Sequence, residues 1–238
     1  MKNSLLGFAG VLALGAATQA VVATERGAWS EQQVYTYAVQ LDADGRVQEV
    51  VPVGAGGDAL GAEFADRIGT WLFTTDSRSG HGQDSSVRTY LRLVVSPGAN
   101  GPELVSATTG PAPQRLTQPE YPVREQREGR QGAVVLKLNI GADGHVRTSE
   151  VDSVHGNVSR RMAAAARSAA TEWRFSPELV DARPVEGTVL WPVCFLGAGS
   201  TATHCAWSGP EARLYSSKTV LPLDPVARPV MPLAFDAR

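Results

Sequence analysis

Residues 133–140 read Ala-Val-Val-Leu-Lys-Leu-Asn-Ile, and the pair Asp143-Gly144 follows shortly after. β-branched and apolar residues with a late polar alternation favour a strand that packs against a helix on one face. The Asp-Gly pair tolerates the positive φ angles of a tight hairpin turn, and extended character resumes over residues 146–151. The stretch therefore predicts a β-hairpin.

The hairpin is followed by a predicted helix and a last strand. Apolar residues, mostly alanine, recur every three or four positions through residues 158–173, and Pro177 prevents further continuation. A stripe of alanine lets the helix lie close to the sheet. Trp173 and Phe175 are predicted core residues, and each stabilises the fold by on the order of 1.5–3 kcal/mol when buried. An apolar strand at residues 189–195 completes a small α+β unit.

Several short motifs follow one another through this part of the chain. They are Gln-Pro-x-Tyr-Pro at 118–122, Gly-Ala-Val-Val at 132–135, Asp-Gly-x-Val at 143–146, the alanine-rich helix, Trp-Arg-Phe-x-Pro at 173–177 and Val-x-Phe at 193–195. In this order and spacing they resemble the TonB C-terminal domain family. The resemblance implies a periplasmic module in which a helix packs on a small antiparallel sheet. It also implies that the edge strand and the Gln-Pro-x-Tyr-Pro segment meet the TonB box peptide and the plug of outer-membrane receptors.

A stretch nearer the N-terminus repeats much of the pattern. Asp44-Gly45 answers Asp143-Gly144 at an offset of 99 positions (143 minus 44), and Trp-Leu-Phe at 71–73 answers Trp-Arg-Phe at 173–175. We therefore expect an internal duplication. The first copy should have strands at 34–41, 47–53 and 87–95 and a helix at 59–71, with Trp71 and Phe73 in its core.

The predicted fold class is therefore α+β, with two small modules of the TonB C-terminal type. Each is expected to be a helix packed on a three-stranded antiparallel sheet, and the first copy lacks the Tyr-Pro segment. The expected organisation is a signal peptide or N-terminal anchor at 1–23, a degenerate module at 31–96, a Pro/Gly-rich linker at 97–117, the TonB C-terminal-like domain at 118–205 and a Pro-rich tail at 206–238.

Residues 1–23 have the pattern of a secretory signal peptide. Lys2 precedes an apolar run, and small residues surround possible cleavage points after Ala20 and Ala23. The competing interpretation is an uncleaved anchor, since ~20 apolar residues span a bilayer. Thr18, Gln19 and three glycines weaken the anchor interpretation. We expect the protein to be located in the periplasm of a Gram-negative bacterium. The alternative is a protein that is anchored in the inner membrane and faces the periplasm.

The chain has only two cysteines, Cys194 and Cys205. We expect the protein to be exported, and disulfides form outside the cytoplasm. A disulfide between them would close a loop of about ten residues and stabilise the fold by roughly 2–3 kcal/mol. Redox catalysis would need a Cys-x-x-Cys pair or a polarised thiolate, and neither is visible. A zinc site that adds His204 lacks a fourth ligand at a recognisable spacing, so the structural bridge is the favoured prediction.

The composition points away from catalysis and from nucleic acid. The formal net charge is −2 and no long basic run occurs, so we expect no binding to nucleic acid. The four histidines are scattered, and no serine or cysteine nucleophile is spaced to pair with them. We therefore predict that the protein is not an enzyme and uses no metal or other cofactor.

The predicted mechanism is recognition of an extended peptide that adds a strand to the sheet edge. The resemblance carries over a set of partner-binding candidates: Gln118, Pro119, Tyr121, Pro122, Val189, Leu190, Trp191 and Val193. The expected partner is an outer-membrane TonB-dependent receptor or another envelope protein. An alternative role for Tyr121 is to fasten the approach segment to the core.

Two other functions stay open at this point. The first is a membrane-anchored TonB energy transducer for outer-membrane uptake, which would couple to the proton-driven inner-membrane complex only if the N-terminus is an uncleaved anchor. Energised TonB proteins carry a histidine in that membrane helix, whereas no histidine precedes His81 here. The second is a structural envelope protein that binds no receptor. The sequence leaves the oligomeric state open.

Overall fold

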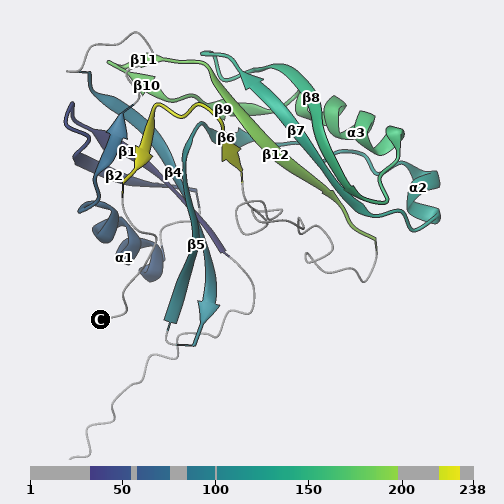
Figure 1. Ribbon diagram of the computed structural model, residues 1–238, viewed down its shortest axis with the longest axis horizontal. Coiled ribbons are helices and arrows are strands. Elements are labelled where there is room, and N and C mark those ends of the chain that lie inside the picture. The colour runs from purple at the N-terminus through teal and green to yellow at the C-terminus, as the bar shows by residue number, and fades with distance from the viewer. Residues whose placement is uncertain (1–32, 55–57, 76–84, 100, 198–219, 231–238) are drawn as a thin grey trace, which may run out of the picture.

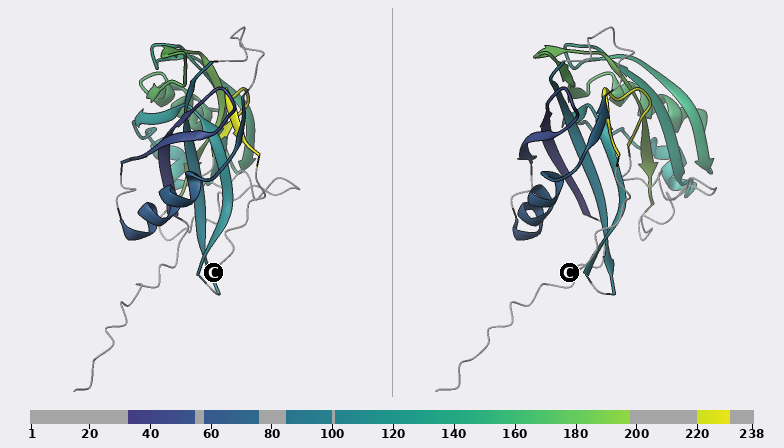
Figure 2. Two further views of the ribbon diagram at one scale, coloured as in Figure 1. Left: turned by 90° about the vertical axis from the view of Figure 1, so that its left-hand side faces the viewer. Right: turned by 60° about the vertical axis from the view of Figure 1, so that its left-hand side comes forward.

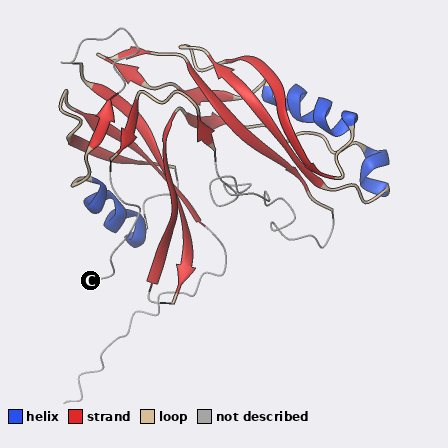
Figure 3. Cartoon of the chain, in the orientation of Figure 1, coloured by secondary structure: helices blue, strands red, loops and turns tan. Residues whose placement is uncertain are grey.

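The computed structural model describes residues 33–54, 58–75, 85–99, 101–197 and 220–230. Strands predominate, and helices α1 and α3 lie at opposite ends of the molecule with the sheets between them (Figure 1, Figure 3). The buried apolar side chains form two clusters, one beneath each helix. The α+β class expected from the sequence is therefore observed.

The C-terminal core lies between α3 and a four-stranded sheet of order β13-β12-β7-β8. Its elements are β7 (Gly132–Ile140), β8 (Val146–Gly156), α3 (Arg160–Ala170), β9 (Arg174–Ser176), β12 (Gly187–Phe195) and β13 (Leu221–Pro222). Met162, Ala166 and Ala170 are fully buried on the sheet side of α3, so the small side chains let the helix approach closely. Trp173 and Phe175 are buried in the same core.

The N-terminal core lies beneath α1 and is built by the same succession of elements. These are β1 (Gln33–Leu41), β2 (Val47–Val53), α1 (Ala59–Ile68), β3 (Phe73–Thr75) and β4 (Val87–Gly98), with β4, β1 and β2 adjacent in the sheet. Phe64, Ile68 and Phe73 are buried, whereas Trp71 is only partly buried. The helix ends at Ile68, short of the predicted residue 71, and a tight turn follows in which Trp71 N–H donates to the Ile68 carbonyl (2.9 Å).

The two halves share several local details. Gly45 and Gly144 have φ angles of 75° and 77°, which the Asp-Gly hairpin turns require. The carbonyl of each glycine accepts a hydrogen bond from a phenylalanine of the short strand after the helix, Phe73 and Phe175 respectively, both at 2.9 Å. Each hairpin also has a register shift just before the turn, at positions 40/41 and 139/140, which again differ by 99 (139 minus 40).

The prediction of a linker at residues 97–117 is wrong. Most of this segment forms β5 (Gly101–Gly110), which pairs with β4, and β6 (Ala112–Arg115), which pairs with β9. Its prolines stand where they do not interrupt a central ladder: Pro97 and Pro102 face each other at the end of the β4–β5 hairpin, and Pro111 lies between strands. The proline content of this segment therefore suggests a linker, but the positions of the prolines are compatible with strands.

The expected three-stranded sheets are both larger than predicted. In the N-terminal half, β4 pairs with β5 and also with β10 (Leu179–Val180), which is followed by β11 (Arg183–Pro184). The connection between β9 and β12 thus contributes strands to the sheet of the other half. The β4 edge would otherwise leave backbone groups unpaired, and the chain satisfies them with its own later segments.

Residues 220–230, which we call the tail strap, run between the two halves of the molecule (Figure 2). The strap contains β13, which pairs with β12, and β14 (Ala227–Pro229), which pairs with β3. Val220, Pro222, Val226 and Ala227 are buried. Part of the predicted Pro-rich tail therefore belongs to the folded body.

Candidate strand-binding site

The candidate site is the outer edge of β12. Backbone groups of alternate residues in a strand point to opposite sides. The Thr188 carbonyl accepts from Leu223 N–H of the tail strap (2.8 Å), so Thr188, Leu190, Pro192 and Cys194 direct their backbone groups away from β7. Pro192, which has no N–H, therefore costs the β7–β12 ladder nothing.

The approach segment, residues 117–122, runs alongside β12 on the helix-covered face of the sheet. At one end, the indole N–H of Trp173 donates to the Thr117 carbonyl (2.8 Å), and the Trp173 ring lies against Trp191 of β12 (centroids 5.6 Å apart). At the other end, the Tyr121 ring meets Phe195 edge to face, with centroids 5.2 Å apart. The two predicted parts of the site are thus brought together.

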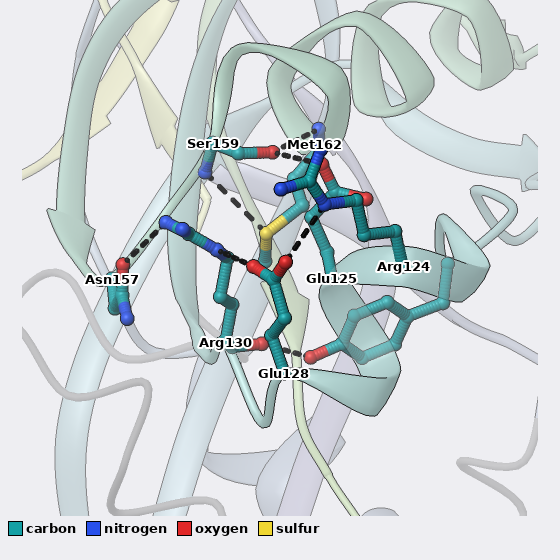
Figure 4. A network of polar contacts seen from close by, with 8 residues as sticks. Arg124, Glu125, Glu128, Arg130, Asn157, Ser159 and Met162 are labelled. Carbon is teal, nitrogen blue, oxygen red and sulfur yellow. Dashed lines mark hydrogen bonds and ion pairs between the residues drawn. The ribbon is translucent and has the colours of Figure 1, made fainter.

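A polar network holds the chain just after the approach segment (Figure 4). The short helix α2 (Val123–Arg127) carries Glu125, whose carboxylate accepts from the Ser159 hydroxyl at the start of α3 (3.1 Å). Glu128 accepts from Arg124 and from Arg130, each at 2.7 Å, and Arg130 also donates to the Asn157 side chain (3.0 Å). The network ties α2 to the N-terminus of α3 and to the end of β8.

Tyr121 has a clear packing role. Its hydroxyl donates to the Arg130 carbonyl, and its ring packs against the C-terminal core. Burial raises the pKa of the Tyr121 hydroxyl, so the tyrosine is neutral and acts as a donor at physiological pH. These contacts agree with the alternative that Tyr121 fastens the approach segment to the core.

We therefore expect measurable stability losses from changes at Tyr121. Tyr121→Phe should lower the free energy of unfolding by about 1 kcal/mol, because it removes only the hydrogen bond to Arg130. Tyr121→Ala should lower it by about 2–3 kcal/mol, because the contact with Phe195 is lost as well. Urea denaturation followed by tryptophan fluorescence measures both. Equal losses for the two variants would contradict the importance of the ring contact.

The β12 candidates contribute mainly backbone to the edge. The side chains of Val189, Leu190, Trp191 and Val193 are all at most 9% exposed, so they supply little open side-chain surface. Trp191 is enclosed by Trp173 and Phe175, and the Arg92 guanidinium of the other half lies over its ring, 6.0 Å from the centroid. Desolvation at this position lowers the pKa of Arg92 to about 10.

The remaining predicted site residues divide by exposure. Gln118 is exposed, whereas Pro119 and Pro122 are half-buried. Cys205 and His204 lie outside the described residues, so the bridge from Cys194 stays a prediction. Thr188 and Asp224 also belong to this edge, because the Thr188 N–H donates to the Asp224 carboxylate (2.6 Å). No motif in the sequence indicates this contact. A two-residue strand such as β13 is too short to show any period.

A helix packed on an antiparallel sheet, with a strand edge beside a Gln-Pro-x-Tyr-Pro segment, defines a small module of the strand-accepting type. Residues 117–196 match the family described as Gram-negative bacterial TonB protein C-terminal. This part of the chain is therefore a TonB C-terminal domain, as the motif pattern predicted.

Similar proteins include two that are named Protein TonB, from two strains of Xanthomonas campestris pv. campestris. Each is 31% identical to this chain over 91 residues, which is 38% of this chain and 40% of the relative. The chain thus spans less than half the length of these relatives, and the similarity is confined to one part of each protein. None of the helices in the described residues has the length and apolar character to cross a bilayer.

Proposed function

We propose that this protein is a TonB-like periplasmic binding protein with a role in TonB-type transport. It engages an outer-membrane TonB-dependent receptor, or another envelope protein, by strand addition at β12. The observation that best supports this is the position of β12 in its sheet. On the side of β12 that faces away from β7, the described part of the chain has only β13, which pairs with β12 at two residues. An extended peptide binds such an edge through main-chain hydrogen bonds.

The opposite edge of the same sheet is less suited to a partner strand. β8 exposes the charged side chains Arg147, Glu150 and Asp152, and its ladder with β7 has two register shifts. Charges and bulges on an edge strand discourage pairing with another chain. The approach segment also lies beside β12 and contacts it through Tyr121. We therefore favour β12 as the acceptor.

We further propose that residues 31–96 are a diverged second copy of the domain that accepts no partner strand at the equivalent edge. The shared element order, hairpin turns and register shifts support the duplication. In this copy β4 takes the place of β12, and β5 pairs with it from Tyr90 to Gly98. The edge that is open to exchange in one copy is filled along most of its length in the other.

Chemical-shift mapping by NMR tests the acceptor strand. A synthetic peptide that carries the TonB box of a receptor should shift the amide signals of residues 188–195 and leave those of β8 largely unchanged. Binding should be weak, because a strand of five to seven residues makes a contact below ~1,200 Å². Shifts confined to β8 or β2, or no binding by a panel of receptor peptides, would reject the proposal.

Tyr121→Ala separates recognition from packing in the same assay. If Tyr121 contacts the partner, the folded variant should bind the receptor peptide several-fold more weakly, while Tyr121→Phe, which keeps the ring, binds normally. Unchanged affinity in folded Tyr121→Ala would assign the residue to packing alone.

Localisation also remains a proposal, since residues 1–23 lie outside the described residues. N-terminal sequencing with cell fractionation decides it. A mature chain that begins after Ala20 or Ala23 and is released with the periplasm supports the soluble binding protein. Retention of Met1 in the inner membrane would favour the anchored energy transducer, which works with the proton-driven complex. A purely structural envelope role would be favoured if no receptor peptide binds.

A further inference from the structure

The tail strap covers the part of the β12 edge that is formed by Thr188 and Leu190. Leu221 pairs with Leu190, and Pro222 pairs with Val189. Leu223 N–H donates to the Thr188 carbonyl (2.8 Å), and the Asp224 carboxylate accepts from the Thr188 N–H (2.6 Å). The strap thereby satisfies outward backbone groups of β12 in the way that an added peptide strand would.

The register of the strap suits a strand that can be exchanged. Pro222 stands opposite Val189, whose backbone groups point toward β7, so the missing N–H of this proline falls where no bond to β12 is due. Only two positions of the strap are paired with β12, compared with nine in the β7–β12 ladder. In the described part of the chain, no strand pairs with the outer side of β12 beyond Leu190.

The far end of the strap is fastened to the N-terminal half. β14 pairs with β3, and Val230 N–H donates to the Leu72 carbonyl (2.8 Å). Between the two strands, Val226 N–H donates to the buried Glu178 carboxylate (3.2 Å), which also accepts from the Thr89 hydroxyl of β4 (2.5 Å). The Thr109 hydroxyl of β5 donates to the Ala227 carbonyl.

We infer that the tail strap is a self-supplied strand that guards the acceptor edge of β12, and that the N-terminal half serves as its clamp. The inference rests on the proposed strand addition at β12. An incoming extended peptide displaces β13 to reach Thr188 and Leu190, while β14 and the contacts around Glu178 keep the displaced strap attached and ready to return. Partner binding therefore competes with an intramolecular strand, which lowers the apparent affinity for the partner.

Two variants of the full chain weaken β13 without altering β12. Leu221→Pro removes the N–H that faces Leu190, and Asp224→Ala removes the acceptor for the Thr188 N–H. Asp152→Ala, at an exposed position of β8, is the matched control. The probes are a synthetic TonB box peptide and a synthetic peptide with the sequence of residues 218–230, and fluorescence anisotropy measures both.

Both strap variants should bind either peptide at least fivefold more tightly than the wild type, and the control should bind like the wild type. The strap peptide should also compete with the receptor peptide. Affinities within twofold of the wild type in both variants would overturn the clamp while leaving strand addition at β12 intact. If no receptor peptide binds but the strap peptide prefers the variants, the receptor proposal fails and the guarded edge is supported.

Discussion

Gly144→Ala is expected to lower the free energy of unfolding by about 3 kcal/mol or more. A left-handed backbone costs a residue with a Cβ roughly 1–2 kcal/mol, and Gly144 has φ +77°. In addition, the new Cβ would lie 2.1 Å from the Phe175 carbonyl oxygen, so β9 must move. That movement weakens the hydrogen bond from Phe175 N–H to the Gly144 carbonyl and shifts a buried ring in the core.

Gly129→Ala isolates the backbone term. Gly129 has φ +64°, but a Cβ there would meet nothing within 4 Å, so the expected loss is only about 1–2 kcal/mol. Gly45→Ala should resemble Gly144→Ala, because its Cβ would lie 1.9 Å from the Phe73 carbonyl oxygen. Urea denaturation of the three variants measures the differences. A Gly144→Ala protein as stable as Gly129→Ala would contradict the close approach of β9 to the turn.

The second large effect is a dependence of stability on pH, and it is expected from Glu178, a residue that is only 2% exposed. Burial, with a smaller contribution from the charge of Asp224, raises the pKa of Glu178 to about 7. The hydrogen bonds from Thr89 and Val226 and the charge of Arg228 lower this pKa but do not offset the burial. The folded state therefore holds the proton more tightly than the unfolded chain, whose carboxyl titrates near pH 4.5.

The free energy of unfolding should consequently fall as pH rises from about 4.5 to about 7. One pKa unit corresponds to about 1.4 kcal/mol, so the loss is up to about 3 kcal/mol. The glutamine of Glu178→Gln does not titrate. The free energy of unfolding of this variant, measured relative to that of the wild type, should therefore rise by that amount between pH 4.5 and pH 8. Denaturation at several pH values measures it, with the exposed Glu186→Gln as the control for loss of one charge. A difference that stays constant with pH would refute the buried titration.

The features that could be predicted from the sequence are local ones. The turns at Asp44-Gly45 and Asp143-Gly144 depend on residue types that tolerate positive φ, and the structure has positive φ at both glycines. The alanine stripe of α3 and the buried Trp173 follow from spacing and size within one segment. The TonB C-terminal domain was recognisable because its motifs occur in order within residues 117–196.

The features that were missed depend on pairing between distant segments. The prolines of residues 97–117 favour a linker only if their register is ignored, so composition does not reveal β5, and β10 is too short to show a period. The strap was visible only as Pro-rich composition, whereas its position is decided by contacts with β12, β3 and Glu178. Local composition does not specify which edge a short strand will cover.

The pairing of β14 with β3 has a consequence for the order in which the chain folds. The Thr74 hydroxyl donates to the Arg228 carbonyl across a sequence separation of 154 residues (3.4 Å), and Ala227 is part of the N-terminal core. The first half of the chain therefore leaves the ribosome, and in an exported protein the translocon, before β14, the partner strand of β3, has been made. Contacts this distant in sequence slow folding. The N-terminal half completes its fold only after the strap has been delivered, and β12 of the other half gains β13 at the same stage.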